Sequence, residues 1–300
     1  MAREKLELVE VSPRDGLQNE PDIVSTENKL DLIRRIVDAG FRRLEAGSFV
    51  NPKKVPQMAD GDAVFAGVAA REDVTYIALA LNPRGVERAL AAGAKEINYV
   101  FCASDGFSIR NNGGTVEETF AVWPEVAAAA KAGGARLSAT ISTAFGCPFD
   151  GEVPVKRVVQ VAERCVSELI FELALADTIG VGAPSDVHER FKAVKAITPR
   201  DVQLRAHFHN TRNTALANAV AAVEEGVRVL DGSLGGIGGC PFAPGAAGNV
   251  PTEDLLYMLA RMGFDTGVNL DRAVETARFL GGVLGRQTPG MVSRAPKWPG

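Results

Sequence analysis

Two histidines, His207 and His209, are separated by a single residue near the end of the stretch QLRAHFHN, which has the character of a strand. On a strand, both imidazoles would project from the same face. Together with a carboxylate such as Asp15, they would form a two-histidine, one-carboxylate metal site. A pair of hydrogen-bonded structural histidines is the alternative. The chain contains only three histidines, so the placement of two here favours the metal site.

Arg14 and Asp15 follow an apolar run and precede Gly16. Such pairs are commonly solvated surface charges, but at the end of a strand an Arg offers a rigid fork to a developing oxyanion. An Asp there is a hard oxygen ligand. Glu45 lies inside a predicted strand, where an acid is costly unless it is paired, so it either pairs with Arg14 or a nearby Lys, or acts in catalysis. Asp177 ends another strand and either caps the next turn or reaches a substrate.

A glycine-rich segment, 235–248, holds Cys240 near its middle. Such glycine density is typical of a mobile loop or of a backbone that approaches another group closely. A phosphate-cradling loop is a weaker interpretation, because the GK[ST] ending is missing. We predict that Cys240 acts in catalysis or lies beside the substrate, since a glycine-rich loop is a poor place to bury a thiol. Cys102, Cys147 and Cys165 are predicted to be buried and inert.

The composition excludes several classes of protein. The chain has 300 residues, a formal net charge of -4 and 46% hydrophobic residues, which is typical of a globular protein and unlike a basic polyanion binder. No run approaches the roughly 18 apolar residues that span a membrane, and the first residues resemble neither a signal peptide nor a transit peptide. The scattered cysteines argue against a zinc ribbon or a redox pair. We expect a cytoplasmic protein without nucleic-acid or membrane partners.

Eight short runs with strand character alternate with helical patterns. One helical stretch, 26–40, places Leu30, Ile33 and Ile36 on one face and ends at Gly40. Short phrases that end in glycine precede several of the strands, and together they indicate a βα unit repeated eight times. The expected strands span residues 6–12, 43–49, 75–81, 96–102, 136–143, 169–177, 203–210 and 227–234.

Eight such units predict an α/β protein built as a (β/α)8 TIM barrel, a fold that takes about 250 residues. An open doubly wound sheet is the alternative, but no GxGxxG follows the first strand, which disfavours its dinucleotide-binding version. We expect residues 1–300 to form a single catalytic barrel domain, with 265–300 as a C-terminal helical extension and tail. Within that extension, 271–285 is an extra helix and 293–300 a loose tail.

In a barrel of this kind, functional groups lie where the strands end. The residues capable of chemistry collect at those ends: Arg14, Asp15 and Gln18 after the first strand, Glu45 on the second, Asp177 and Thr178 at the sixth, His207 and His209 on the seventh, and Cys240 and Asn249 after the eighth. Lys53, Lys54 and Arg110 lie on other loops, where they are either solvated or contact a phosphorylated carrier. His188 is expected on the surface of a helix.

Four motifs together resemble one family, the 3-hydroxy-3-methylglutaryl-CoA lyases. They are VEVSPRDGLQNE, LEAGSFVNPKKVPQMAD, ADTIGVG and GGIGGCPFAPGAAGNVPTEDLLYML, and the resemblance covers about residues 6–290. The last motif is highly specific, whereas RDGxQ is shared with related Claisen synthases. The resemblance implies a barrel that holds one Mg²⁺ or Mn²⁺ and no organic cofactor, takes an acyl-CoA substrate and forms a homodimer.

The resemblance also implies roles for individual residues. The implied metal ligands are Asp15, His207, His209 and Asn249; the implied catalytic residues are Arg14, Glu45, Asp177 and Cys240; the implied substrate contacts are Arg14, Gln18, Thr178, Arg110 and Asn111. The implied reaction is a metal-dependent retro-Claisen cleavage of 3-hydroxy-3-methylglutaryl-CoA to acetoacetate and acetyl-CoA. In it, Arg14 would stabilise the enolate oxygen and Cys240 would deliver a proton to the enolate carbon.

This chain departs from the family pattern at several positions. Asn210 replaces the Asp of HxHDT, Ala176 replaces a Gly, Ala174 stands where Ser is common, and LGRQTPG (284–290) replaces an NRKT-like segment that would meet the CoA. Cleavage of another 3-hydroxyacyl-CoA, such as citramalyl-CoA to give pyruvate, is therefore the main alternative. A condensing synthase is less favoured, because the chain has no room for a large regulatory domain. A non-catalytic barrel that binds a CoA ester is disfavoured because every implied ligand is present.

Overall fold

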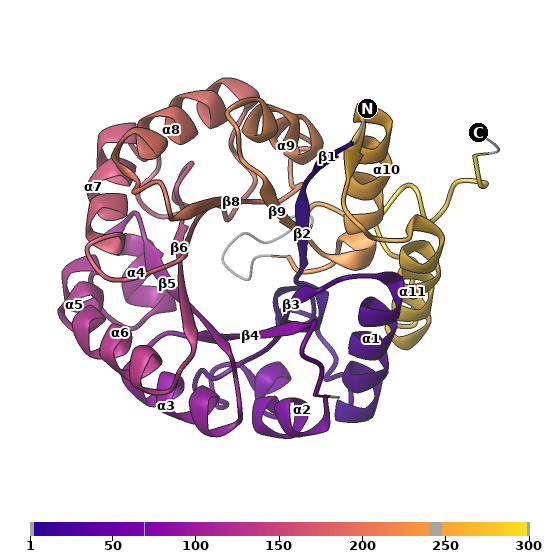
Figure 1. The fold of residues 1–300 in the computed structure, drawn as a ribbon, viewed down its shortest axis with the longest axis horizontal. Helices are drawn as coiled ribbons and strands as arrows, with labels where there is room; N and C mark the ends of the chain where they lie inside the picture. Colours follow the sequence, from indigo (N-terminus) through magenta and orange to yellow (C-terminus); the bar gives the residue numbers. More distant parts are fainter. Residues whose placement is uncertain (1–2, 69, 240–247, 299–300) are drawn as a thin grey trace.

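The computed structural model describes residues 3–68, 70–239 and 248–298. Within them, eight parallel strands close into a barrel in sequence order, from β2 to β9 (Figure 1). The strands are β2 (Glu7–Glu10), β3 (Arg43–Ser48), β4 (Thr75–Ala80), β5 (Glu96–Cys102), β6 (Arg136–Ser142), β7 (Glu172–Asp177), β8 (Gln203–Phe208) and β9 (Val229–Gly232). Closure comes from the pairing of the first and last of these strands, in which Glu7 lies opposite Val229. The predicted TIM barrel is confirmed, and the open doubly wound sheet is excluded.

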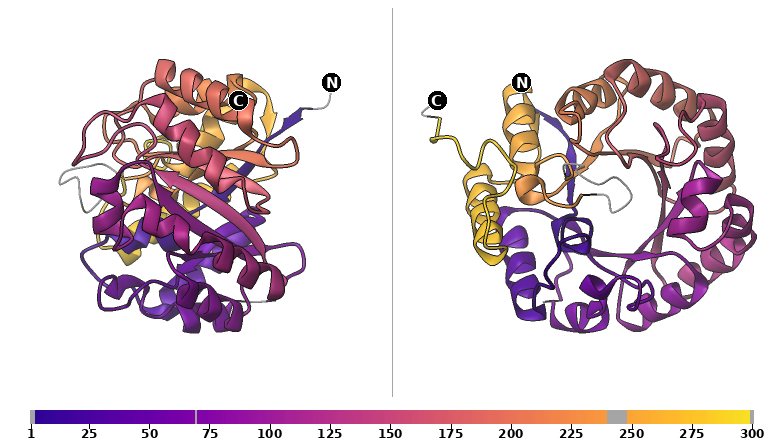
Figure 2. Two further views of the ribbon diagram at one scale, coloured as in Figure 1. Left: turned by 90° about the vertical axis from the view of Figure 1, so that its left-hand side faces the viewer. Right: turned by 180° about the vertical axis from the view of Figure 1, so that it is seen from behind.

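A ring of helices surrounds the barrel (Figures 1 and 2). The helices are α1 (Thr26–Ala39), α2 (Gly61–Gly67), α3 (Pro83–Ala91), α4 (Asp105–Asn111), α5 (Val116–Ala121), α6 (Trp123–Ala132), α7 (Val155–Cys165), α8 (Pro184–Ile197), α9 (Ala215–Glu224), α10 (Thr252–Met262) and α11 (Leu270–Val283). Local signals set the ends of α1: the Ser25 side chain accepts a hydrogen bond from the Asn28 N–H, and Gly40 adopts the left-handed conformation that ends the helix.

The main apolar core lies between the outer faces of the strands and the helices. From α1, Leu32, Ile33 and Ile36 are buried in it, whereas Leu30 packs at its edge. Inside the barrel, a small separate apolar cluster is made of Val9, Val11, Ile77 and Val229. Branched apolar side chains usually fill barrel interiors. Here much of that space is left to polar side chains, and these form the floor of the site described below.

Seven of the eight strands are shorter than their predicted ranges, and only 96–102 matches its range at both ends. The range 169–177 is a strand only from Glu172, and 227–234 is a strand only over Val229–Gly232. Beyond β9 the chain changes partner, because Ser233 forms a bridge with Pro251, and the backbone then turns. Gly235 and Gly236 both adopt positive φ angles, of 74° and 71°, in the short helical turn η3 (Leu234–Gly236). A strand cannot continue through this left-handed backbone.

The C-terminal extension is held more firmly than expected. The predicted extra helix is α11, and it packs against α1, so both ends of the chain share one side of the barrel (Figure 1). The N-terminal strand β1 (Glu4–Lys5) pairs in parallel with β10 (Phe264–Asp265), which the sequence did not predict. The start of the predicted loose tail is also fixed, because Ser293 is buried and Arg294 donates to the Thr288 carbonyl at 3.1 Å.

No helix in the described ranges has the length and apolar character that crossing a membrane requires.

Candidate active site

A cavity of about 1000 Å³ opens at the carboxyl ends of the barrel strands. Most of the site residues predicted from the sequence line it: Arg14, Asp15, Gln18, Glu45, Arg110, Asn111, Thr178, His207 and His209. Asp177 and Asn249 lie behind this wall, and Cys240 falls outside the described residues. Barrel closure therefore gathers groups from β2, β3, β5, β7 and β8 around one volume.

Three of these groups form a metal-sized cluster. The ligand atoms of Asp15, His207 and His209 all lie within 4.8 Å of one another, and His209 Nε2 is 3.9 Å from Asp15 Oδ2. Asp15 stands on the short helical turn η1 (Ser12–Gly16) that follows β2, His207 on β8, and His209 just beyond the end of β8. Two imidazoles and a carboxylate converging at this spacing can bind one divalent cation.

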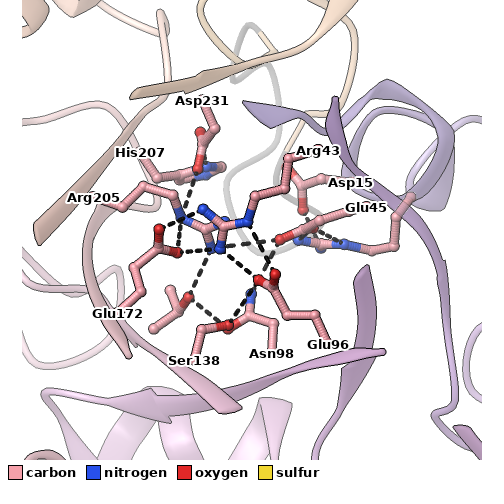
Figure 3. Close-up of polar contacts among 12 residues, drawn as sticks. Asp15, Arg43, Glu45, Glu96, Asn98, Ser138, Glu172, Arg205, His207 and Asp231 are labelled. Carbon is pink, nitrogen blue, oxygen red and sulfur yellow. Dashed lines mark hydrogen bonds and ion pairs between the residues drawn. The ribbon is translucent and has the colours of Figure 1, made fainter. Parts of the chain in front are cut away.

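The orientation of His207 is set from behind the cluster. Its Nδ1 lies 2.8 Å from Asp231 Oδ1, and both residues are labelled in Figure 3. Burial disfavours a charged imidazole, but the neighbouring Asp231 carboxylate outweighs burial and raises the pKa of His207 above its ordinary value. With Nδ1 directed at Asp231, Nε2 is the nitrogen available to a metal ion. A carboxylate behind a histidine ligand is a common device for fixing its ring.

Asn249 contacts the cluster from the loop before α10. Its Nδ2 donates to Asp15 Oδ2 at 2.7 Å and to the Ile237 carbonyl at 3.1 Å. Its Oδ1 is buried and has no hydrogen-bond partner among the described residues. A buried oxygen without a partner is costly, and a cation would satisfy it. The donor set of carboxylate, two imidazoles and carboxamide oxygen thus fits a hard divalent ion.

Arg14 is clamped between two acids at the cavity wall. Its Nε donates to Glu45 Oε2 at 2.6 Å, its Nη2 donates to the same oxygen, and its Nη1 donates to Asp15. The alternative in which Glu45 pairs with Arg14 is therefore the observed arrangement. Burial disfavours the Asp15 anion, but Arg14 and then the two imidazoles outweigh it and hold the pKa of Asp15 well below its usual range. The acid stays ionised, as a metal ligand must be.

Asp177 faces a turn rather than the cavity. Its carboxylate accepts hydrogen bonds from the Val181 and Gly182 N–H groups, each at 2.9 Å, and the residue is fully buried. Burial raises the pKa of Asp177 above its ordinary value, even though both N–H groups favour the anion. The turn cap that the sequence left open is thus observed, and the catalytic role of Asp177 stays a prediction. The adjacent Thr178 does line the cavity, and its hydroxyl accepts from the Thr143 N–H at 2.8 Å.

The mouth of the cavity carries the predicted substrate contacts. Arg110, on α4, is exposed, donates to the Gly106 carbonyl at 2.8 Å, and places its guanidinium 3.9 Å from the Phe149 ring centroid. Asn111 and Lys54 lie beside it in the lining. Gln18 also lines the cavity, and its Oε1 is buried without a hydrogen-bond partner in the ranges that the structure covers. This edge offers cations and amides to a bound molecule.

The remaining thiols and the third histidine lie away from this chemistry. Cys102, Cys147 and Cys165 are free and buried, as predicted. Burial raises the pKa of the Cys102 thiol to about 12, which leaves it almost entirely protonated. His188 lies on α8 with its Nδ1 2.7 Å from Glu225 Oε1, in the helical position that the sequence indicated.

Sequence reasoning missed a charged network beneath the cavity, inside the barrel (Figure 3). Its members include Arg43, Glu96, Asn98, Glu172, Arg205 and Asp231, all of which are buried. A signal was present, because polar residues occupy every second position of several strands, as in Glu96 and Asn98 on β5 and Arg205 and His207 on β8. In a barrel, that period assigns them all to the interior face.

Known proteins resemble this chain over nearly its whole length. The family model described as HMGL-like matches residues 5–280. The chain belongs to the HMGL-like family. It is 43% identical to the mitochondrial hydroxymethylglutaryl-CoA lyase of Rattus norvegicus over 291 residues, which is 97% of this chain and 89% of that one. It is 40% identical to the (R)-citramalyl-CoA lyase of Chloroflexus aurantiacus over 307 residues, which is 99% of this chain and 96% of that one.

Solved structures of HMGL-like proteins have the same fold. The structure of an HMG-CoA lyase from Acinetobacter baumannii, in complex with coenzyme A and 3-methylmalate, matches with a TM-score of 0.93 at 41% identity. The match covers 97% of this chain and 95% of that one. An HMG-CoA lyase from Pseudomonas aeruginosa matches with the same TM-score and identity and covers 98% of this chain and 97% of that one. The family resemblance seen in the sequence motifs is confirmed.

Proposed function

We propose that this protein is a metal-dependent carbon–carbon lyase that cleaves 3-hydroxy-3-methylglutaryl-CoA to acetoacetate and acetyl-CoA by a retro-Claisen reaction. One observation carries the proposal: the cluster of Asp15, His207 and His209 lies beside the clamped Arg14 in a single large cavity. The membership of the chain in the HMGL-like family, with relatives that are themselves CoA-ester lyases, supports the same reaction.

Asp15, His207, His209 and Asn249 would hold the metal ion, and Mg²⁺ or Mn²⁺ suits this donor set. The bound ion would act as a Lewis acid toward the hydroxyl and an adjacent oxygen of the substrate. Asp231 keeps the His207 ring turned toward the cluster. Asn249 keeps Asp15 in place through its Nδ2. No organic cofactor is part of the proposal.

The other proposed catalytic residues act on charge and on protons. Arg14 would donate to the thioester oxygen as that oxygen gains charge, and Glu45 holds its guanidinium in position. Asp15 or one of the two imidazoles would accept the proton of the substrate hydroxyl. Cys240 would return a proton to the enolate carbon; this assignment rests on the sequence motif alone, because Cys240 lies outside the described residues.

The substrate proposal includes a place for the CoA portion. Arg110 and Lys54 at the cavity mouth carry the positive charge that a phosphorylated carrier requires, and Asn111 and Gln18 offer amides along the way in. The resolved coenzyme A complex of the Acinetobacter relative supports a CoA ester as the ligand class. Residues 1–300 as one catalytic domain, a homodimer and a cytoplasmic location complete the proposal, and all three rest on the sequence.

Citramalyl-CoA is the second candidate substrate, and specific observations favour it. The Chloroflexus relative is a (R)-citramalyl-CoA lyase, and its match covers nearly all of both chains. Ala176, one of the departures from the HMG-CoA lyase pattern, lines the cavity beside Thr178. A change in the lining alters the fit of the acyl group, while the proposed metal ligands and Arg14 stay in place. The reaction class is thus common to both candidates.

A panel of 3-hydroxyacyl-CoA thioesters, with products identified by mass spectrometry, tests the proposal. With Mg²⁺ present, we expect acetyl-CoA plus acetoacetate from HMG-CoA, and acetyl-CoA plus pyruvate if citramalyl-CoA is the substrate. A chelator should abolish turnover, and Mg²⁺ or Mn²⁺ should restore it. Full activity in protein verified to be metal-free would contradict the metal mechanism, and no cleavage of any thioester would contradict the lyase assignment.

A further inference from the structure

Arg205 lies inside the barrel, below the cluster of Asp15, His207 and His209. It lies on β8 two residues before His207, is 1% exposed, and lines the floor of the cavity. Its guanidinium stands among carboxylates that come from three other strands (Figure 3). A cation in this position is costly to bury, so its partners matter.

Two sets of contacts connect this guanidinium to the proposed catalytic residues. We call them the Asp231 arm, which leads to His207, and the Glu45 arm, which leads to Arg14. Arg205 Nε lies 3.4 Å from Asp231 Oδ2, and the other oxygen of Asp231 holds His207. Arg205 Nη2 lies 3.5 Å from Glu45 Oε1, and the other oxygen of Glu45 holds Arg14. One side chain thus touches the two carboxylates that orient a metal ligand on one side and the oxyanion donor on the other.

A closed ring of polar contacts fixes the Glu45 arm. Asn98 Nδ2 donates to Glu45 Oε1 at 3.0 Å, Thr140 Oγ1 donates to Asn98 Oδ1 at 2.9 Å, and Arg205 Nη2 donates to Thr140 Oγ1 at 3.3 Å. The Arg205–Glu45 contact closes the ring across β3, β5, β6 and β8. Ala174 lies between Thr140 and Arg205 in register, and its small side chain leaves this span to the guanidinium.

A second buried arginine provides a contrast within the same interior. Arg43 makes close hydrogen bonds to Glu172, at 2.6 and 2.8 Å, and to Glu96, at 3.0 Å. Among the polar contacts of the described residues, it reaches neither Asp231 nor Glu45, and it does not line the cavity. Arg43 therefore has the burial and charge of Arg205 without its connection to the site.

We infer that Arg205 is a positioning residue, which sets the places of His207 through Asp231 and of Arg14 through Glu45. The inference rests on the proposed function, because it assumes that His207 binds the metal and that Arg14 acts on the substrate. Arg205 contacts both carboxylates as ion pairs, at 3.4 and 3.5 Å, and among the described residues its hydrogen bond goes to Thr140 instead. A guanidinium spreads its charge over a plane that can face two carboxylates at once, whereas an ammonium is a compact point charge. Losing Arg205 should therefore loosen both arms together, whereas losing Arg43 should loosen neither.

The test compares two double variants that carry the same change in charge. Glu172 pairs with both arginines, so Glu172→Gln is combined with Arg205→Met in one protein and with Arg43→Met in the other. For each protein, the Kd of Mn²⁺ is measured by titration, kcat and KM by steady-state kinetics, and Tm by thermal unfolding. We expect the Arg205 variant to bind Mn²⁺ about 10-fold more weakly, the scale for residues that support metal ligands, and to lose at least as much in kcat. The Arg43 variant should stay within about two-fold of Glu172→Gln alone, although both lower Tm.

Arg205→Lys and Arg43→Lys keep the buried charge, and they decide the matter if either double variant does not fold. A double-mutant cycle of Arg205→Lys with Asp231→Asn should be non-additive in the Kd of Mn²⁺, because both changes act on one arm. Equal effects of the Arg205 and Arg43 variants on metal affinity, or none from either, would overturn the inference. The wild type separates the two hypotheses: if it binds no Mn²⁺, the proposed metal site itself is wrong.

Discussion

The two faces of the barrel strands have opposite chemistry, and β8 shows this within one segment. Ala206 and Phe208 point outward and belong to the apolar core under the helices. Arg205 and His207, which alternate with them, point inward and line the cavity. The outer face buries large apolar surface and thereby stabilises the fold. The inner face holds charges that would be costly without the partners that barrel closure provides.

Stability and activity therefore depend on different faces of the same strands. Buried ion pairs add little net stability, so the interior network is better explained by the site that it supports. The outer core can tolerate the loss of a catalytic group as long as its own packing remains. Neighbouring residues on one strand should therefore respond to substitution in opposite ways.

The largest effect is expected for His207→Ala, with Phe208→Ala as its matched partner. His207→Ala removes a proposed metal ligand, so we expect kcat/KM to fall by about 10³-fold or more, since Lewis-acid stabilisation is worth several kcal/mol. Phe208→Ala empties a fully packed site and should reduce the free energy of unfolding by about 3–5 kcal/mol. Steady-state kinetics and denaturant unfolding of both variants measure the two effects.

His207→Ala should keep most of its unfolding free energy, and the folded fraction of Phe208→Ala should keep most of its activity. If instead both variants lose stability and activity in the same proportion, the two faces are not separable in this barrel.

The next effect concerns Arg14, which is held by Glu45 and Asp15. Arg14→Lys keeps the charge but loses the planar fork. Because the enolate oxygen gains charge only as the bond breaks, we expect kcat to fall by about 10²-fold while KM changes much less. Steady-state kinetics decide the point. An unchanged kcat with a many-fold rise in KM would make Arg14 a binding residue instead of a catalytic one.

The smallest effect is expected for Glu10. This acid is an exception to the contrast, because it lies on the outer face of its strand. Val9 and Val11 point into the barrel, so Glu10 between them faces the outer shell, where it accepts from the Ser12 and Leu234 N–H groups at 2.8 and 3.0 Å. Burial raises the pKa of Glu10 from its ordinary 4.5 to about 7. The folded protein thus binds this proton more tightly than the unfolded chain, so its stability should fall as pH rises through that interval.

Glu10→Gln keeps the accepting oxygen and removes the titration. We compare the free energy of unfolding of the variant with that of the wild type. This difference should shift in favour of the variant by about 1–3 kcal/mol when the pH is raised from 5 to 8. Denaturant unfolding at the two pH values, with the variant and the wild type compared at each, isolates this group from others that titrate. A difference that is the same at both pH values would show that Glu10 is not protonated in the folded protein at pH 5.

Much of the fold could be read from the sequence because its signals are local. The helix stop at Gly40, the apolar face of α1 and the eightfold alternation of strands and helices each depend on residues close together in the chain. The spacing of His207 and His209 likewise fixed their shared direction before any fold was known. A barrel then requires every strand end to face one cavity, which brought Arg14 and Asp15 to the histidines.

Only the tertiary structure decided which side chains contact one another across the barrel. Asn249 donates to Asp15 from 234 residues away, because closure sets β2 beside β9. The partners of Arg205 come from β3, β6, β7 and β9, and no local pattern identifies which carboxylate lies opposite which guanidinium. Strand register and barrel closure fix those distances, and neither is encoded by the spacing of residues within a single strand.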